Sequence, residues 1–193
     1  MAKMSNLIFV ANTSLDGYTE DKDGKFDWTE PSEEYFRFVT NIVRSTPTHL
    51  YGRRMYETMM VWETDPNLAA ESPSMRDFAE IWQAANKIVY SRTLETISTR
   101  NTQLEQTFDP EAIRQLKATG EHDILIGGPE LAAHAFLARL IDECHLFLIP
   151  ILVGGGKSAL PDNVRLELEL LDERHFGNGE VYLCYRVRQG RAT

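Results

Sequence analysis

Short apolar runs alternate with segments of helical period along most of the chain. The apolar runs predict strands at 7–11, 48–51, 87–90, 102–106, 122–126 and 144–153. Apolar residues three and four apart predict helices at 32–45, 53–60, 75–85, 109–119 and 129–139. Two more strands, 167–176 and 180–188, flank Gly177-Asn178-Gly179 and predict a hairpin. This order is typical of an α/β fold, a three-layer α/β/α sandwich around a mostly parallel, mixed sheet with a C-terminal antiparallel hairpin.

Polar residues mark where several of these elements begin and end. The stretches 12–30 and 65–74 are predicted as loops. Ser32 fits the N-cap of the helix after the first loop, with Glu33 and Glu34 as acids of its first turn. Asp109 fits a second N-cap, and Gly120 the end of that helix.

Composition narrows the class of protein. The 193 residues carry 29 acidic and 20 basic side chains, a formal charge of −9, and 42% are hydrophobic. We expect one globular domain over 1–193. The longest apolar run, 146–153, is too short to span a bilayer, and no signal-peptide pattern opens the chain, so we expect a cytoplasmic protein. The acidic charge argues against broad nucleic-acid binding, but a few local arginines can still hold a small anion.

Cysteine and histidine give no sign of a metal site. Cys144 and Cys184 each lie in an apolar run, without a C-x-x-C motif or a histidine at ligand spacing, and are predicted as buried free thiols. The five histidines are scattered along the chain. We therefore predict no bound metal.

Ligands of mostly parallel sheets bind beyond the carboxyl ends of the strands, so the residues after each strand are the candidates for a site. After the first strand comes Asn12-Thr13-Ser14-Leu15-Asp16-Gly17. This segment is either a polar turn or a loop whose backbone approaches a planar ligand, with Ser14 and Asp16 in the cleft.

Three further loops after strands suit phosphate groups. Gly52-Arg53-Arg54-Met55 and Gly127-Gly128-Pro129-Glu130-Leu131 each start a helix, where free N–H groups attract anions. The paired arginines add bidentate donors, although ordinary surface arginines are the alternative. Ser91-Arg92-Thr93 offers a hydroxyl and a guanidinium. Together these loops suit a dinucleotide, but without a G-x-G-x-x-G they are not a Rossmann fingerprint.

The run Gly154-Gly155-Gly156-Lys157-Ser158 is not a phosphate-binding P-loop. That motif needs a glycine where this chain has Ile151, and Pro161 prevents a long helix from following. We expect a flexible turn at the rim of the cleft, with Lys157 near the substrate.

In this order, the motifs resemble the dihydrofolate-reductase-like superfamily. More narrowly, the chain is similar to the reductase domain of riboflavin biosynthesis (the RibD C-terminal type), which is the C-terminal half of a bifunctional deaminase/reductase, and to its stand-alone bacterial relatives. The similarity covers almost the whole chain. It rests on Ser14-x-Asp16-Gly17, Gly52-Arg53-Arg54-Met55-Tyr56-Glu57, Val89-Tyr90-Ser91-Arg92, Ile126-Gly127-Gly128-Pro129-Glu130-Leu131 and Pro150-Ile151-Leu152-x-Gly154-Gly155-Gly156.

The resemblance implies NADPH as the cofactor and assigns residues to its parts. Gly52, Arg53, Arg54 and Met55 would hold phosphates, and Ser91 and Arg92 would lie at the adenosine end and favour the 2′-phosphate. Ala11, Ser14 and Gly17 would border the nicotinamide. The pyrophosphate and nicotinamide half would lie against the second glycine loop, which in this family often carries a cis peptide; its residues are Gly127, Gly128, Pro129, Glu130 and Leu131.

Carboxylates are the candidates for the proton donor. Dihydrofolate reductases carry a carboxylate on the helix after the first loop, and Glu33 and Glu34 lie near that place, but both are also explained as dipole caps. The Ser-x-Asp-Gly loop belongs to the riboflavin-type branch, and no deaminase zinc motif precedes it. Asp16 is therefore the first candidate for orienting the substrate or relaying a proton, and Glu34 the second.

The hypothesis is an NADPH-dependent reductase that transfers hydride to a C=N or C=O carbon of a small heterocyclic substrate. The most similar activity is reduction of 5-amino-6-(5-phosphoribosylamino)uracil. Dihydrofolate reduction, a non-catalytic NADPH- or flavin-binding module and a purely structural dimer are the alternatives. A homodimer is expected from the resemblance, with the strand 146–153 and the hairpin as its surface.

Overall fold

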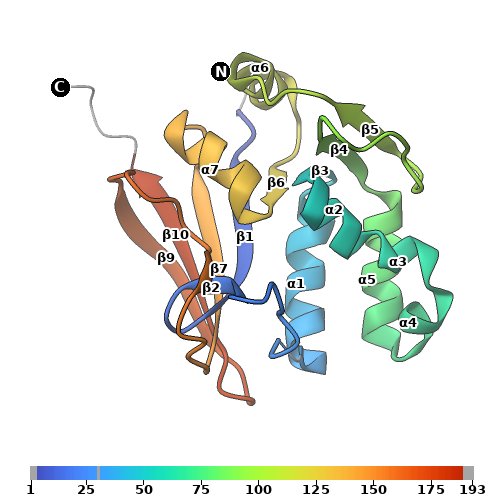
Figure 1. Cartoon of the computed structure of the whole chain (residues 1–193), viewed down its shortest axis with the longest axis vertical. Helices are drawn as coiled ribbons and strands as arrows, with labels where there is room; N and C mark the ends of the chain where they lie inside the picture. The colour runs from blue at the N-terminus through green and yellow to red at the C-terminus, as the bar shows by residue number, and fades with distance from the viewer. Residues whose placement is uncertain (1–3, 30, 189–193) are drawn as a thin grey trace.

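The computed structural model describes residues 4–29 and 31–188, and one eight-stranded sheet organises them. Its order is β5-β4-β3-β6-β1-β7-β10-β9 (Figure 1). The parallel strands are β1 (Leu7–Ser14), β3 (Thr48–Gly52), β4 (Asn86–Tyr90), β5 (Thr102–Glu105), β6 (Ile124–Gly127) and β7 (Glu143–Ile149). The antiparallel hairpin consists of β9 (Glu167–His175) and β10 (Val181–Arg188).

Helices cover both faces of this sheet. One face carries α6 (Pro110–Thr119) and α7 (Pro129–Leu137). The other carries α1 (Glu33–Ser45), α2 (Arg53–Met59), α3 (Val61–Thr64), α4 (Pro66–Ala70) and α5 (Pro73–Ala84) (Figure 1). The predicted three-layer α/β fold is confirmed. In the described part of the chain no helix is long and apolar enough to cross a membrane.

The predicted helix ends follow from local hydrogen bonds. The Ser32 hydroxyl accepts the Tyr35 N–H at the start of α1, and the Asp109 carboxylate accepts the Glu111 N–H at the start of α6. Gly120 is the C-cap of α6. These caps agree with the prediction because they depend on residues only a few positions apart.

Two predicted loops contain regular structure. The stretch 12–30 holds the end of β1 and all of β2 (Tyr18–Asp21), which pairs antiparallel with β8 (Gly156–Ser158). The stretch 65–74 holds α4, whose N-cap is Asp65. The strand predicted at 144–153 ends at Ile149, before Pro150, which has no N–H to donate. The sequence pattern missed β2 and β8 because their partners lie more than 130 positions apart.

Cys144 and Cys184 are both buried and free, as predicted. They lie on adjacent strands but on opposite faces of the sheet. Cys144 packs into the core under α6 and α7, and Cys184 into the core under α1 and α5. Burial raises the pKa of the Cys144 thiol to about 12, so it is protonated at neutral pH.

Candidate active site at the strand ends

A cleft of about 650 Å³ opens where β1, β3 and β6 end. It has two parts of different chemistry. The first, called here the strand-end half, is formed by Ala11, Gly52, Arg54, Met55, Gly127, Gly128, Pro129, Glu130, Leu131 and Lys157. The second, called here the aromatic half, is formed by Tyr35, Phe36, Val39, Val43, Met59, Val61, Trp62 and Phe78. Most of the predicted cofactor residues therefore lie on the wall of one cleft.

Two helices begin side by side in the strand-end half. Gly52 is the N-cap of α2 and Gly128 the N-cap of α7, and neither start has a side-chain cap. They are neighbours because β3 and β6 pair in parallel, with Tyr51 opposite Gly127. Helix starts of this kind leave backbone N–H groups free for an anion.

The glycine pair of this half is needed for packing as well as for access. A Cβ at Gly127 would lie 3.0 Å from Cε1 of Tyr51, and one at Gly128 would lie 3.0 Å from Cβ of Met55. Gly128 also has φ +88°, a conformation that favours glycine. No described peptide bond is cis, so the cis peptide implied by the family resemblance is wrong for this structure.

A chain of ion pairs crosses the mouth of the cleft. Glu20 of β2 accepts Arg54 Nη2 at 2.8 Å and Lys157 Nζ at 3.0 Å, and Lys157 also reaches Glu130 at 2.7 Å. The hydrogen bond from Lys157 lowers the pKa of Glu130 below its usual value. The pairing of β2 with β8 puts Glu20 opposite Lys157 and so brings Lys157 to the cleft, as the sequence predicted.

Three predicted cofactor residues lie beside the cleft and are not on its wall. Arg53 pairs with Glu57 at 2.7 Å and donates to the Thr93 hydroxyl at 2.9 Å. The Ser91 hydroxyl accepts the N–H groups of Thr93 and Leu94 and so shapes the loop after β4. Arg92 is exposed and forms no ion pair within residues 4–29 and 31–188. These residues form a cationic rim next to the strand-end half.

The Ser14, Asp16 and Gly17 loop is also off the cleft wall. The Asp16 carboxylate accepts the N–H groups of Val153 and Gly154 at 3.2 and 2.8 Å. A hydrogen bond with the Ser14 hydroxyl, together with those backbone bonds, lowers the pKa of Asp16. Asp16 therefore fastens the glycine turn to the end of β1, and its position gives no support to the predicted catalytic role.

Glu34 has a similar anchoring function on α1. It pairs with Arg174 at 3.0 Å and accepts the Gly177 N–H at 3.3 Å. The hydrogen bond from Arg174 lowers the pKa of Glu34. Glu34 ties α1 to the hairpin and lies outside the cleft wall, so its position also gives no support to a role as proton donor.

Asn12 and Tyr35 are polar wall residues that the sequence analysis did not single out. The Tyr35 hydroxyl donates to Asn12 Oδ1 at 2.9 Å, and burial raises the pKa of Tyr35, so it keeps its proton at neutral pH. The motif containing Asn12 was predicted as a loop. Only the pairing of β1 with β7, which places Asn12 opposite Phe147, shows that it is a strand residue.

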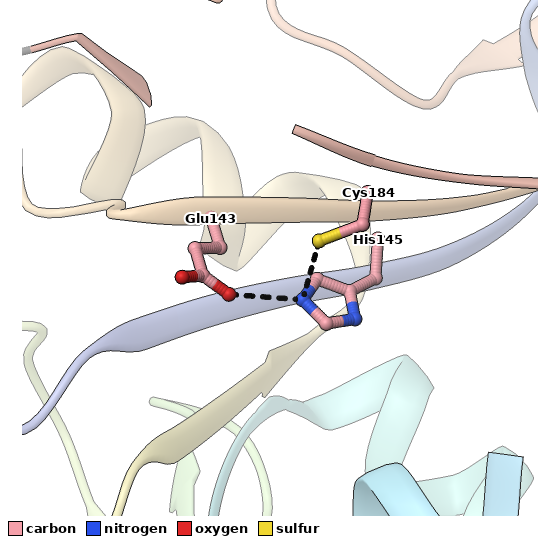
Figure 2. A group of neighbouring side chains, drawn as sticks. All are labelled: Glu143, His145 and Cys184. Atoms are coloured by element: carbon pink, nitrogen blue, oxygen red, sulfur yellow. Dashed lines mark hydrogen bonds and ion pairs between the residues drawn. The ribbon is translucent and has the colours of Figure 1, made fainter. Parts of the chain in front are cut away.

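A second group of reactive side chains lies away from the cleft, on β7 and β10. Figure 2 shows the Glu143 carboxylate and the Cys184 sulfur both directed at one nitrogen of the His145 ring. Nε2 lies 3.3 Å from the Glu143 carboxylate and 3.4 Å from Cys184 Sγ, while Nδ1 lies 2.8 Å from the Tyr182 hydroxyl. Burial alone would lower the pKa of His145, but Cys184 and Glu143 together raise it to about 9. Hydrogen bonding by a protonated imidazole accounts for this group, and the absence of a metal stays a prediction.

Residues 5–182 match the family model described as the RibD C-terminal domain. The chain belongs to this family. A curated relative, the uncharacterized protein YyaP of Bacillus subtilis (strain 168), is 26% identical over 186 residues, which cover 95% of each chain. The match confirms the family resemblance that the motifs carried.

Solved structures share the fold at lower identity. A putative riboflavin biosynthesis protein from Shewanella sp. PV-4 has a TM-score of 0.74 and 22% identity, covering 95% of this chain and 99% of that one. A deaminase/5-amino-6-(5-phosphoribosylamino)uracil reductase from Thermotoga maritima has a TM-score of 0.65 and 18% identity, covering 96% of this chain and 57% of that one. Acinetobacter baumannii RibD has a TM-score of 0.72 and 14% identity, covering 97% and 59%.

Proposed function

We propose that this RibD-type chain is an NADPH-dependent reductase that adds hydride to a C=N or C=O carbon of a small heterocycle. One observation carries the proposal: two uncapped helix starts meet an apolar, aromatic-lined pocket in a single cleft. An anionic dinucleotide matches the helix starts, and a flat substrate ring matches the aromatic pocket beside them. The described reductase activity of the Thermotoga relative supports the same reaction class.

The residues present fit such a cofactor. The first turn of α7 offers free N–H groups behind Gly128, and Arg54 and Lys157 can exchange a carboxylate partner for a phosphate. Arg53 and Arg92, beside the strand-end half, would hold a further phosphate at the adenosine end, as the family resemblance implies. When bound, NADPH would supply the hydride.

The chain's own residues would bind and polarise the acceptor. Asn12 can donate an amide N–H to the oxygen or nitrogen that gains negative charge as hydride arrives at the neighbouring carbon. Tyr35, which donates to Asn12 Oδ1, holds that amide in place. The proton that completes the reduction would come from water at the open mouth of the cleft. This assigns to Asn12 and Tyr35 the orienting function first predicted for Asp16.

The alternatives differ in what they predict. A dihydrofolate reductase would be expected to aim a carboxylate from α1 into the cleft, whereas Glu33 and Glu34 bond to Ser74 and Arg174. A non-catalytic module would bind NADPH without oxidising it in the presence of any carbonyl or imine compound. A homodimer is a separate proposal, supported by the exposed Leu168 and Leu170 on the edge strand β9, and sedimentation equilibrium tests it.

Calorimetric titration with NADPH tests the proposed function. Wild-type protein should bind NADPH with a sub-millimolar Kd, and Arg54→Ala should weaken binding about tenfold because a phosphate contact is lost. Arg44→Ala is the matched control. Arg44 is similarly exposed and also ion-paired, with Asp77, but it is not on the cleft wall. No NADPH binding by the wild type, or equal losses in the two variants, would contradict the proposal.

A further inference from the structure

The aromatic half of the cleft has a wall of carbon-rich side chains. Phe36, Trp62 and Phe78 contact one another edge to face, with ring centroids 4.8 to 5.9 Å apart. Val39 and Met59 line the same half. Walls of aromatic edges and aliphatic groups favour a flat, apolar ring.

The hydroxyls on the cleft wall are already bonded to protein. Those of Thr19, Thr29 and Thr58 donate to backbone carbonyls at 3.3, 2.8 and 3.0 Å. The Tyr51 hydroxyl contacts His49 Nδ1 and accepts the Trp82 indole N–H. The protons of the threonine hydroxyls are therefore already used within the protein, and the described residues of the aromatic half include no carboxylate that could accept from a sugar hydroxyl of a ligand.

Asn12 differs from these groups. Its Oδ1 accepts from Tyr35, while its amide N–H groups have no partner in the part of the chain that the structure describes. It can therefore serve one acceptor atom of a ligand, such as a ring nitrogen or a carbonyl oxygen.

The charges on the cleft wall disfavour a substrate that carries a phosphate of its own. Among the described wall residues, the cations are Arg54 and Lys157, and the carboxylates are Glu20, Glu57 and Glu130. Both cations are ion-paired, and both lie in the strand-end half, where the dinucleotide phosphates are proposed to bind. A phosphate in the aromatic half would have no cation of its own and would be poorly solvated.

We infer that the substrate is an uncharged, planar heteroaromatic compound of one or two rings without a phosphate, seated in the aromatic half with a ring nitrogen or carbonyl oxygen at Asn12. The inference rests on the proposed function, which puts the cofactor in the strand-end half. Its own evidence is the wall of the aromatic half. The inference separates this chain from reductases of phosphoribosylated pyrimidines, whose substrate brings a sugar and a phosphate to the site.

Calorimetric titration of the protein with two compounds tests the inference, and each titration is made with and without saturating NADPH. The first is quinoxaline, an uncharged two-ring compound with C=N bonds, and the second is uridine 5′-monophosphate, a phosphoribosylated pyrimidine. The matched variants are Met59→Lys and Met60→Lys. These neighbouring methionines are both partly buried, but only Met59 is on the cleft wall.

Quinoxaline should bind the wild type saturably, and uridine 5′-monophosphate should give no binding heat. Met59→Lys should weaken quinoxaline binding about tenfold, since an ammonium replaces apolar wall, and Met60→Lys should change it less than about twofold. Tighter binding of the nucleotide, no binding of quinoxaline, or equal effects of the two variants would overturn the inference. The proposed function fails separately, by absence of NADPH binding, and the titrations without NADPH would still probe the aromatic half.

Discussion

The two halves of the cleft recognise a ligand by different means. The strand-end half offers mainly backbone, from two helix starts, a glycine pair and the ends of three parallel strands, with the side chains of Arg54 and Lys157 beside them. In the aromatic half the recognising groups are side chains from α1, α2, α3 and α5. Backbone recognition suits a phosphate-rich cofactor common to many reductases, whereas side chains are easily exchanged. We therefore propose that the strand-end half holds the cofactor of the family and that the aromatic half selects the substrate.

The variant Gly128→Val tests most strongly whether the strand-end half is the dinucleotide site. A β-branched residue at φ +88° is strained, and its Cβ would lie 3.0 Å from that of Met55, so α2 and α7 must move apart. We expect an NADPH affinity lower by about a hundredfold and a free energy of unfolding lower by about 2–3 kcal/mol. Calorimetry and urea unfolding measure the two effects.

Gly177→Val is the control for this change, because Gly177 lacks a positive φ and its nearest neighbour is the Glu34 carboxylate at 4.0 Å. It should leave the NADPH affinity unchanged. If Gly128→Val binds NADPH as well as the wild type does, the strand-end half is not the dinucleotide site.

Asn12→Leu should act on the substrate and leave the cofactor site intact. Leucine has a similar branched shape but lacks the amide that would serve the acceptor atom, so kcat/KM should fall about ten- to a hundredfold. NADPH affinity should stay within about twofold of the wild type, since the change lies outside the helix starts. NADPH oxidation with quinoxaline reports the first quantity and calorimetry the second. An equal loss in both would show that Asn12 does not distinguish the two halves.

Substitution of His145, which is off the cleft wall, should have the smallest effect on ligand binding. It should instead change how the free energy of unfolding depends on pH. The pKa of His145 is raised to about 9 in the folded protein, against about 6.5 when unfolded. The protonated imidazole therefore adds on the order of 2 kcal/mol to the free energy of unfolding below pH 6.5, and this contribution is lost as the pH rises through 9.

Urea unfolding between pH 6 and pH 10 measures this contribution. The His145→Gln variant should lack that part of the decline with pH while binding NADPH like the wild type. Parallel curves for variant and wild type would mean that Glu143 and Cys184 do not hold the imidazole in its charged form.

Sequence patterns predicted the strand-end half well because its signals are local. A glycine or proline at a helix start, and arginines after a strand, can be read within six residues, and Gly52, Arg54, Gly128 and Pro129 all reach the cleft wall. The same reading placed Asp16 and Glu34 in the site. It could not show that Val153, Gly154 and Arg174, more than 130 positions away, already occupy their carboxylates.

The aromatic half could not be predicted from the sequence, because it too depends on contacts between residues far apart in the chain. Phe36 and Phe78 lie in predicted helices of an ordinary core, whereas Trp62 lies outside every predicted element. Only the packing of α1 and α3 against α5 makes the three rings neighbours. The sequence pattern predicted a loop at Asn12, whereas in the structure Asn12 belongs to β1, which pairs with β7. Long-range pairing therefore decided which polar residues face the cleft and which ones hold loops together.

Energy transfer from tryptophan to bound NADPH tests the central claim most directly, because Trp62 is a wall residue of the aromatic half, whereas Trp28 and Trp82 are not on the cleft wall. Titrating the wild type with NADPH should give saturable nicotinamide emission on tryptophan excitation. Trp62→Phe should lower that emission, because one donor on the cleft wall is removed while Trp28 and Trp82 remain, and its calorimetric Kd should stay within about twofold of the wild type. No saturable emission from the wild type, or full emission from Trp62→Phe, would contradict a dinucleotide bound with its nicotinamide beside the aromatic half.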